Sequence, residues 1–241
     1  MVRNLASALT LGVLLVFGAQ TATAQGNWAK MPGGAIDIGA GGDGAVWIIG
    51  KNHSIYSWNE SGFAWTQARG EGHMIAVDAD GQPWVCNDKG NVYKYRGANW
   101  QELPGRCVDI GSGGDGSIWI IGENEGIYKW NEDSYAWEKL SGSAVRITAD
   151  SAGVPWVVNK KDEIYKYRGG NWQQLPGRAT DIGAGGDGSI WIIGENDGIY
   201  QWNEEAYAWG KARGSADKVA IDDSGEVWIV NKKNEIFRLN Q

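Results

Sequence analysis

Tryptophan recurs along this chain at intervals that alternate between 37 and 35 residues, and this periodicity limits the chain to a repeat architecture. A second tryptophan series and a tyrosine series keep the same step, so the sequence holds six units of about 36 residues. The three series are Trp28, Trp65, Trp100, Trp137, Trp172 and Trp209; Trp47, Trp84, Trp119, Trp156, Trp191 and Trp228; and Tyr56, Tyr93, Tyr128, Tyr165, Tyr200 and Phe237.

Two kinds of unit alternate, so a larger unit of 72 residues occurs three times. Residues 105–137 and 177–209 differ at seven of 33 positions, as a recent duplication would leave them. Each small unit contains short runs rich in Ile, Val, Trp and Tyr, such as "AIDIGA" and "AVWIIG", separated by Gly-rich and Asn-rich turns. The sequence therefore predicts four strands in each unit.

One motif in these units suggests a dinucleotide site. Gly39, Gly41 and Gly44 spell G-x-G-x-x-G, but the Asp-Gly pair between two apolar runs predicts a tight hairpin. A dinucleotide site needs a helix after the glycines, because the helix N-terminus holds the pyrophosphate. No helical pattern follows, so no cofactor is predicted.

Six all-strand units favour a six-bladed β-propeller of four-stranded blades over residues 25–241. The chain after Gln25 starts with a lone strand, "NWAKMPG", and ends after only three strands of its last unit. We therefore expect the N-terminal strand to complete the C-terminal blade and to leave no unpaired edge.

Residues 1–24 are predicted to be a secretory signal peptide. Arg3 precedes an apolar run, and Ala22-Thr23-Ala24 fits an A-x-A cleavage site. The protein is therefore expected to be secreted. No later stretch is apolar enough to span a bilayer, so no membrane insertion is predicted.

Charge and motif content disfavour two classes of function. The formal net charge of −7 repels phosphate backbones, so nucleic-acid binding is not expected. No catalytic motif is present, and His53 and His73, which have no equivalent in the other units, are interpreted as solvated surface groups. The sequence therefore predicts no enzyme, no catalytic residue and no metal.

The two cysteines leave two interpretations open. Cys86 stands near the end of a predicted second strand, and Cys107 stands at the start of the first strand of the next unit. These places lie at one height in adjacent blades, so an inter-blade disulfide is possible in an exported protein. The alternative is two separate buried thiols.

The spacing W-x-x-(L/M)-P-G, followed by a D-G hairpin, a Trp-containing strand and I-Y, closely resembles the tectonin repeat. The resemblance covers Trp28 to Leu239. It implies a six-bladed propeller that acts as a lectin on glycans, such as a microbial surface polysaccharide or glycolipid, through repeated sites. A non-enzymatic scaffold that binds a protein partner through one face is the alternative, and the oligomeric state stays open.

Sugars need an aromatic face and planar polar groups, and one kind of unit supplies both in one loop. Trp-Asn-Glu leads to another aromatic residue there, and the predicted carbohydrate-binding pairs are Trp58 and Asn59, Trp130 and Asn131, and Trp202 and Asn203. The alternative is that each Trp packs against the neighbouring blade and each Asn forms an Asx turn. Asn87, Asn159 and Asn231, which end second strands, are further candidates that could line a groove or cap a turn.

Overall fold

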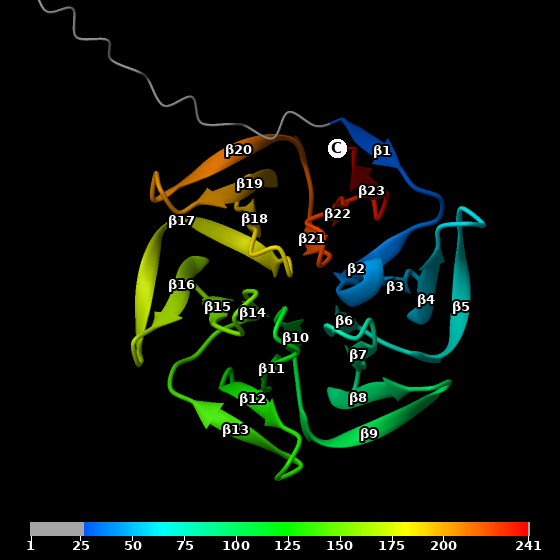
Figure 1. Ribbon diagram of the computed structural model, residues 1–241, viewed down its shortest axis with the longest axis horizontal. Helices are drawn as coiled ribbons and strands as arrows, with labels where there is room; N and C mark the ends of the chain where they lie inside the picture. The colour runs from blue at the N-terminus through cyan, green and yellow to red at the C-terminus, as the bar shows by residue number, and fades with distance from the viewer. Residues whose placement is uncertain (1–26, 241) are drawn as a thin grey trace, which may run out of the picture.

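Strands form along the apolar runs of the sequence and surround a common centre as the four-stranded blades of a β-propeller (Figure 1). The computed structural model describes residues 27–240, and the predicted signal segment lies outside them. This part of the chain holds β1–β23 and one 3-10 turn over Gly42–Gly44. The all-β class and the four-stranded blades are confirmed. Within residues 27–240, no helix has the length and apolar character needed to cross a bilayer.

Four sheets contain four antiparallel strands each. The first three are β2 (Ala35–Ala40), β3 (Val46–Gly50), β4 (Ser54–Asn59) and β5 (Ala64–Glu71); β6 (Met74–Val77), β7 (Pro83–Cys86), β8 (Asn91–Arg96) and β9 (Asn99–Arg106); and β10 (Asp109–Ser112), β11 (Ile118–Ile121), β12 (Ile127–Asn131) and β13 (Ala136–Leu140). The fourth combines β21 (Lys218–Ile221), β22 (Val227–Val230) and β23 (Ile236–Leu239) with β1 (Trp28–Lys30).

The N-terminal strand joins the end of the chain, as the sequence predicts. β1 pairs antiparallel with β23, with Trp28 opposite Leu239 and Lys30 opposite Phe237. In Figure 1 the blue β1 lies beside the red β23. The last three strands thereby gain an outer partner, so β23 is not an open edge.

The remaining strands form one sheet of seven and not two separate sheets of four. Its strands are β14 (Arg146–Ala149), β15 (Pro155–Val158), β16 (Glu163–Arg168), β17 (Asn171–Ala184), β18 (Ile190–Gly194), β19 (Gly198–Asn203) and β20 (Ala208–Ser215). Residues 171–178 of β17 pair with β16, and residues 179–184 pair with β18. One continuous strand therefore serves two successive sequence units.

Burial follows the position of a strand in its sheet. The second strands β7, β11, β15 and β22 are buried along their whole length, whereas the outer strands β5, β9 and β20 are mostly exposed. Neighbouring sheets cover the inner strands on both faces, which explains their continuous apolar runs. Trp84, Trp156 and Trp228, each 1% exposed, are the largest of these buried side chains.

Six outer-strand tryptophans fasten each unit to the one before it. Each indole Nε1–H donates to a backbone carbonyl oxygen of the preceding unit, at 2.5–2.8 Å. The pairs are Trp28 to Arg213, Trp65 to Pro32, Trp100 to Arg69, Trp137 to Pro104, Trp172 to Ser141 and Trp209 to Pro176. We call these contacts the tryptophan clasps, and the N-terminal strand supplies one of them.

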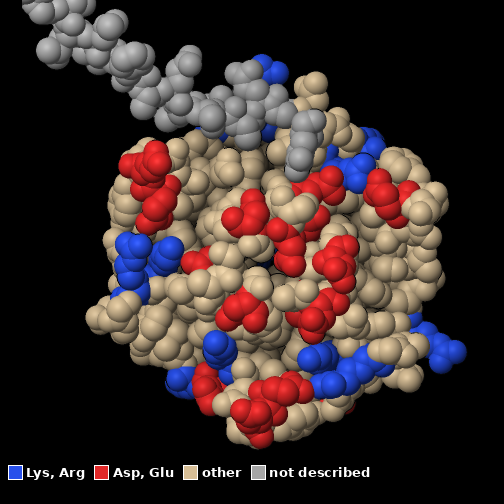
Figure 2. Space-filling model, in the orientation of Figure 1, with Lys and Arg blue, Asp and Glu red and all other residues tan. Residues whose placement is uncertain are grey.

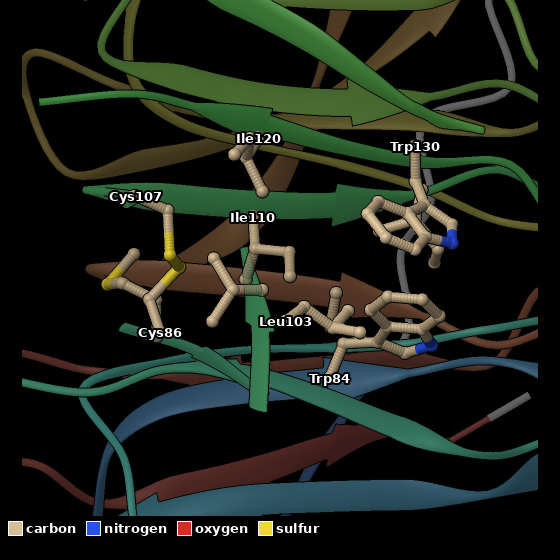
Figure 3. Close-up of a cluster of buried hydrophobic side chains, with 11 residues drawn as sticks. Trp84, Cys86, Leu103, Cys107, Ile110, Ile120 and Trp130 are labelled. Carbon is tan, nitrogen blue, oxygen red and sulfur yellow. A yellow bond between two sulfur atoms is a disulfide. The ribbon is translucent and has the colours of Figure 1, made fainter. Parts of the chain in front are cut away.

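A disulfide joins Cys86 to Cys107, so the bridge is confirmed over the alternative of two thiols. The Cα atoms are 5.9 Å apart, and the bond links the end of β7 to the residues just before β10 in the next sheet. Figure 3 shows it at one end of a buried cluster that also contains Leu103 and Ile110. It closes a loop with a sequence separation of 21 residues.

Replacing the disulfide by the residues of the equivalent place, Cys86→Val with Cys107→Ala, should preserve the fold and lower its stability. Val158 and Ala179 occupy that place and are both fully buried, so the pair fits without strain. Loss of the loop closure should lower the free energy of unfolding by about 3 kcal/mol in urea denaturation. An unchanged free energy of unfolding would show that the bridge does not constrain the unfolded chain.

Candidate functional site

Of the predicted sugar-binding tryptophans, Trp130 is buried, whereas Trp58 and Trp202 are partly buried. Trp130, at the end of β12, is 8% exposed, and its ring lies 6.4 Å from that of Trp84 in the preceding sheet (Figure 3). Trp58 and Trp202 pack in the same way, against Trp228 and Trp156. This is the packing alternative, in which a tryptophan of the preceding unit covers part of each indole. That these residues bind sugar stays a prediction.

Each of these indoles also has its polar atom engaged. Trp58, Trp130 and Trp202 donate Nε1–H to the carboxylates of Glu60, Glu132 and Glu204, at 2.5–2.6 Å. The bond from Trp130, together with Lys94 and Arg96, holds the pKa of Glu132 below its usual value.

The neighbouring asparagines close turns. Their side-chain Oδ1 atoms accept a backbone N–H three residues later, at 2.8–3.0 Å, in the order Asn59 from Gly62, Asn131 from Ser134 and Asn203 from Ala206. Asn131 Nδ2 also donates to Glu138, at 2.6 Å. An Asx-type role therefore accounts for the Oδ1 atoms.

The aromatic residues at the tips of the same turns are exposed. Phe63, Tyr135 and Tyr207 are 55%, 43% and 43% exposed, with φ angles between 46° and 51°. The Tyr135 hydroxyl accepts a hydrogen bond from Gln101 of the preceding sheet, and that of Tyr207 accepts one from Gln173. Phe63 has no hydroxyl, and Ala29 occupies the place of these glutamines. These rings are the accessible aromatic faces of the loop that the sequence singled out.

The second asparagine series caps turns, and one member also lines a hollow. Asn87, Asn159 and Asn231 each accept two backbone N–H groups through Oδ1, at 2.8–3.0 Å. Asn87 borders a hollow of about 750 Å³ between β5 and the next sheet, together with Tyr93 and Trp100. Asn87 therefore both caps a turn and lines a groove, the two roles that the sequence leaves open for this position.

Two further hollows have identical linings. One, of about 360 Å³, lies between the end of β9 and the sheet β10–β13. The other, of about 570 Å³, lies where β17 passes toward β18. Their linings match at eight positions spaced 72 residues apart: Gly105, Arg106, Ile120, Gly122, Glu123, Asn124, Tyr128 and Trp137 in one, and Gly177, Arg178, Ile192, Gly194, Glu195, Asn196, Tyr200 and Trp209 in the other. We call them the paired hollows.

Each paired hollow presents an ion pair beside aromatic rings. Arg106 lies 2.7 Å from Glu123, and Arg178 lies 3.3 Å from Glu195, with all four side chains about half exposed. The hydrogen bond from Arg106 lowers the pKa of Glu123. Asn124 and Asn196 donate to the hydroxyls of Tyr128 and Tyr200, at 3.0 and 3.1 Å. Volumes of 360 and 570 Å³ are typical of small-molecule sites.

The equivalent place in the first 72-residue copy lacks the ion pair. Gly34 stands for the arginine and Lys51 for the glutamate, whereas Asn52, Tyr56 and Trp65 are retained. The Lys51 side chain lies against Gly34, where an added Cβ would meet its Cε at 3.0 Å. Sequence reasoning missed the paired hollows, although the joint change of Arg and Glu between copies was a readable signal.

A ring of buried charge surrounds the centre of the molecule. Asp37, Asp109 and Asp181, from the first strands of three sheets or half-sheets, are 3–6% exposed. Each accepts a backbone N–H from the next unit through Oδ2, at 2.7–2.9 Å. Arg146 and Lys218 lie 3.5 and 3.8 Å from Asp181. Burial raises the pKa of Asp37 to about 6 and that of Asp109 to about 7. The ring has a structural role between strands.

Asp109→Asn should remove a pH dependence of stability. The pKa of Asp109 is about 7 in the fold and about 3.9 in the unfolded chain, so folding takes up a proton between these values. Its contribution to stability is complete below pH 4 and is lost as the pH rises through 7. The free energy of unfolding of the wild type, relative to the variant, should therefore fall by up to about 1.4 kcal/mol per pH unit in that window. Urea denaturation at pH 5 and pH 8 measures it, and parallel profiles for the two proteins would contradict it.

Trp130→Ala should lower the stability of the fold much more than Tyr135→Ala. Trp130 is buried, so its truncation leaves a cavity and should lower the free energy of unfolding by about 3–5 kcal/mol. Tyr135 is 43% exposed, so its truncation should cost less than about 1 kcal/mol. Thermal and urea denaturation of the two variants provide the comparison, and equal losses would show that the tip aromatic is part of the core.

Comparisons with known proteins agree with this architecture. The family model of the Tectonin domain matches residues 74–158 and 151–241. Tectonin-1 of Physarum polycephalum is 30% identical over 66 residues, 27% of this chain and 30% of that protein. Tectonin-2 of the same organism is 30% identical over 67 residues, 27% of this chain and 19% of that protein. The match thus spans less than a third of either relative.

Several solved structures share the fold. A streptogramin B lyase structure superposes with a TM-score of 0.63 and 16% identity, over 89% of this chain and 96% of that one. YCF48 bound to D1 peptide gives 0.61 and 14%, over 89% and 96%. The WD40 β-propeller domain of Doa1 gives 0.62 and 12%, over 90% and 97%. At these identities the likeness shows the fold alone. Because the Tectonin domain model matches well over half of the sequence, the chain belongs to the tectonin family.

Proposed function

We propose that this protein is a secreted lectin that binds glycans through the paired hollows. The observation that carries the proposal is the half-exposed Arg–Glu ion pair beside aromatic rings at the edge of both hollows, whose linings match at eight positions 72 residues apart. Packing between sheets explains the glycines and isoleucines of that lining. Each arginine donates to a backbone carbonyl of its own sheet, that of Lys89 or Lys161, and also reaches across the hollow to the glutamate of the next unit, so a half-exposed ion pair borders the hollow in both copies.

The lining supplies the groups that a sugar needs. Trp137 or Trp209 and Tyr128 or Tyr200 offer apolar ring surface for the C–H side of a pyranose. The guanidinium and the carboxylate offer a fork of donors and a pair of acceptors for neighbouring hydroxyls. Because the two charges already neutralise each other, an uncharged sugar fits better than a sialic acid or a sulfated sugar.

Repetition favours polymeric ligands. Two equal sites on one rigid body gain avidity when they engage one surface together, without new contacts at either site. This suits the surface polysaccharides or glycolipids of microbes, which present the same sugar many times. Carboxylates gather around the centre of the face shown in Figure 2, with cations nearer its edge, which disfavours a polyanion such as nucleic acid.

The proposal includes a closed ring of six blades. The seven-stranded sheet counts as two blades joined through β17, in keeping with the six sequence units. The tryptophan pairs and the asparagine series named from the sequence are secondary sites under this proposal, with the Asn87 hollow first among them. The likeness to streptogramin B lyase is one of fold, and we infer a binding protein and not an enzyme.

A glycan array tests the proposal with a variant in which both paired hollows carry the residues found at the equivalent place in the first 72-residue copy. Arg106→Gly, Glu123→Lys, Arg178→Gly and Glu195→Lys together reproduce the Gly34 and Lys51 pair that this chain already folds with. The wild type should bind a neutral glycan, with competition by the free monosaccharide. The apparent affinity of the fourfold variant for the glycan should fall at least about 10-fold, because the Arg–Glu ion pairs of both hollows are absent.

Three further outcomes are informative. Binding that survives the fourfold change but falls with Phe63→Ala, Tyr135→Ala and Tyr207→Ala together would move the sites to the turn tips. Binding that needs only one hollow would contradict two equal sites. A blank array would overturn the lectin and favour a protein partner.

A further inference from the structure

The two histidines of the chain meet at one place, which we call the histidine corner. His53 lies in the turn before β4, His73 just before β6, and Asp88 in the turn after β7. His53 Nδ1 lies 3.0 Å from one carboxylate oxygen of Asp88, and His73 Nδ1 lies 3.0 Å from the other. The three groups come from two adjacent sheets and share one carboxylate.

The same corner occurs in the other two 72-residue copies with the same backbone. The carbonyl of residue 53, 125 or 197 accepts the N–H of Gly72, Ala144 or Ala216, at 2.9–3.0 Å. The N–H of residue 73, 145 or 217 donates to the end of the second strand, at 2.7–2.8 Å. The backbone thus sets no requirement for histidine, because other residues occupy these places in the same geometry.

The side chains of those other corners form ordinary ion pairs. Glu125 pairs with Lys160, and Asp197 lies 2.7 Å from Lys232. In the histidine corner the acid Asp88 stands at the position of the lysines, and His53 stands at the position of Glu125 and Asp197. A second imidazole, that of His73, replaces Val145 or Asp217. One basic side chain beside Asp88 would be enough to form an ion pair. Two imidazoles around one carboxylate are a set of metal ligands.

The atoms of the corner are placed for coordination. One ligand atom from each of the three side chains, a ring nitrogen of either histidine and a carboxylate oxygen of Asp88, lies within 4.8 Å of the other two. His53 Nδ1 is buried without a hydrogen-bond partner among the described residues, although a carboxylate oxygen is 3.0 Å away. The rings lie almost parallel, with an interplanar angle of 18°. The side chains of His53, His73 and Asp88 are 38–54% exposed, so an ion can reach them from solvent.

The geometry points to a site for a divalent transition metal ion, with Zn²⁺ as the fitting probe, held by His53, His73 and Asp88. Imidazole nitrogen and carboxylate oxygen bind Zn²⁺ at about 2.0–2.2 Å, so small rotations of exposed side chains close the set around the ion. Three protein ligands leave a fourth position for water. The ion would tie the sheet β2–β5 to the sheet β6–β9.

The site also adjoins the disulfide. Asp88 follows Cys86 by two residues, and His73, Asp88, Cys86 and Cys107 line one small hollow of about 210 Å³. The bond from Cys86 ties β7 to the next sheet, and the ion would tie the residues around β7 to the previous one. The sheet β6–β9 would then be fixed on both sides.

Isothermal titration of the chelator-treated full chain with Zn²⁺ tests the site. The wild type should bind one ion at this corner, and the melting temperature should rise with Zn²⁺ concentration. The matched control is His53→Glu, His73→Val and Asp88→Lys together, which copies the corner of Glu125, Val145 and Lys160 and should fold as well. It should show no heat from this site and no rise in melting temperature.

A milder variant separates ligation from general charge effects. His73→Val alone leaves two ligands and should weaken Zn²⁺ binding at least about 10-fold. Absence of Zn²⁺ binding by the wild type would overturn the site. So would equal affinity and equal melting shifts in the wild type and the threefold variant, because the ion would then bind elsewhere, such as among the carboxylates at the centre of the face in Figure 2.

Discussion

The tryptophan clasp is the contact on which the rest of the molecule depends. A four-stranded sheet of this size has too little core to stand alone, so its stability comes from the neighbouring sheet. Each clasp joins two units by an indole N–H bond to a carbonyl, and the ring lies against a glycine with positive φ. At Gly142, an added Cβ would lie 2.8 Å from Trp172 Nε1, so a larger residue would push the indole away. The regular spacing of Trp along the sequence follows from this contact.

The clasp also builds the paired hollows. Gly105 with Trp137, and Gly177 with Trp209, are clasp members and part of the hollow linings. The residue after each glycine, Arg106 or Arg178, is thereby held over the hollow, opposite Glu123 or Glu195 of the next unit. A structural contact repeated between units therefore produces a hollow repeated between units, with one arginine and one glutamate at its edge.

Much of the fold could be read from the sequence because the clasp residues and turns recur at fixed intervals. The pairing of β1 with β23 follows from counting strands against that interval, and the same count places Cys86 and Cys107 at one height in adjacent units, although it leaves two separate thiols as the alternative to the bridge. The continuity of β17 could not be predicted from the sequence. Ala179 and Thr180 belong to this strand, whereas Cys107 and Val108, at the equivalent positions, separate β9 from β10. The roles of the tryptophans were also hidden. Trp130 and Trp137 lie in the same repeat, and only the position of the preceding sheet buries the first more deeply than the second.

Differences between the three 72-residue copies carry more functional information than their similarities. The first copy departs from the others at both places discussed above: Gly34 and Lys51 replace the ion pair of the hollow, and His53, His73 and Asp88 replace the pair at the corner. Neither departure alters the backbone contacts, which the clasps and turns hold in all copies. Because the backbone is fixed by contacts between units, side chains at the edges of those contacts are free to diverge. A repeat protein of this kind can therefore keep one set of edge side chains in two copies and carry a different set in the third.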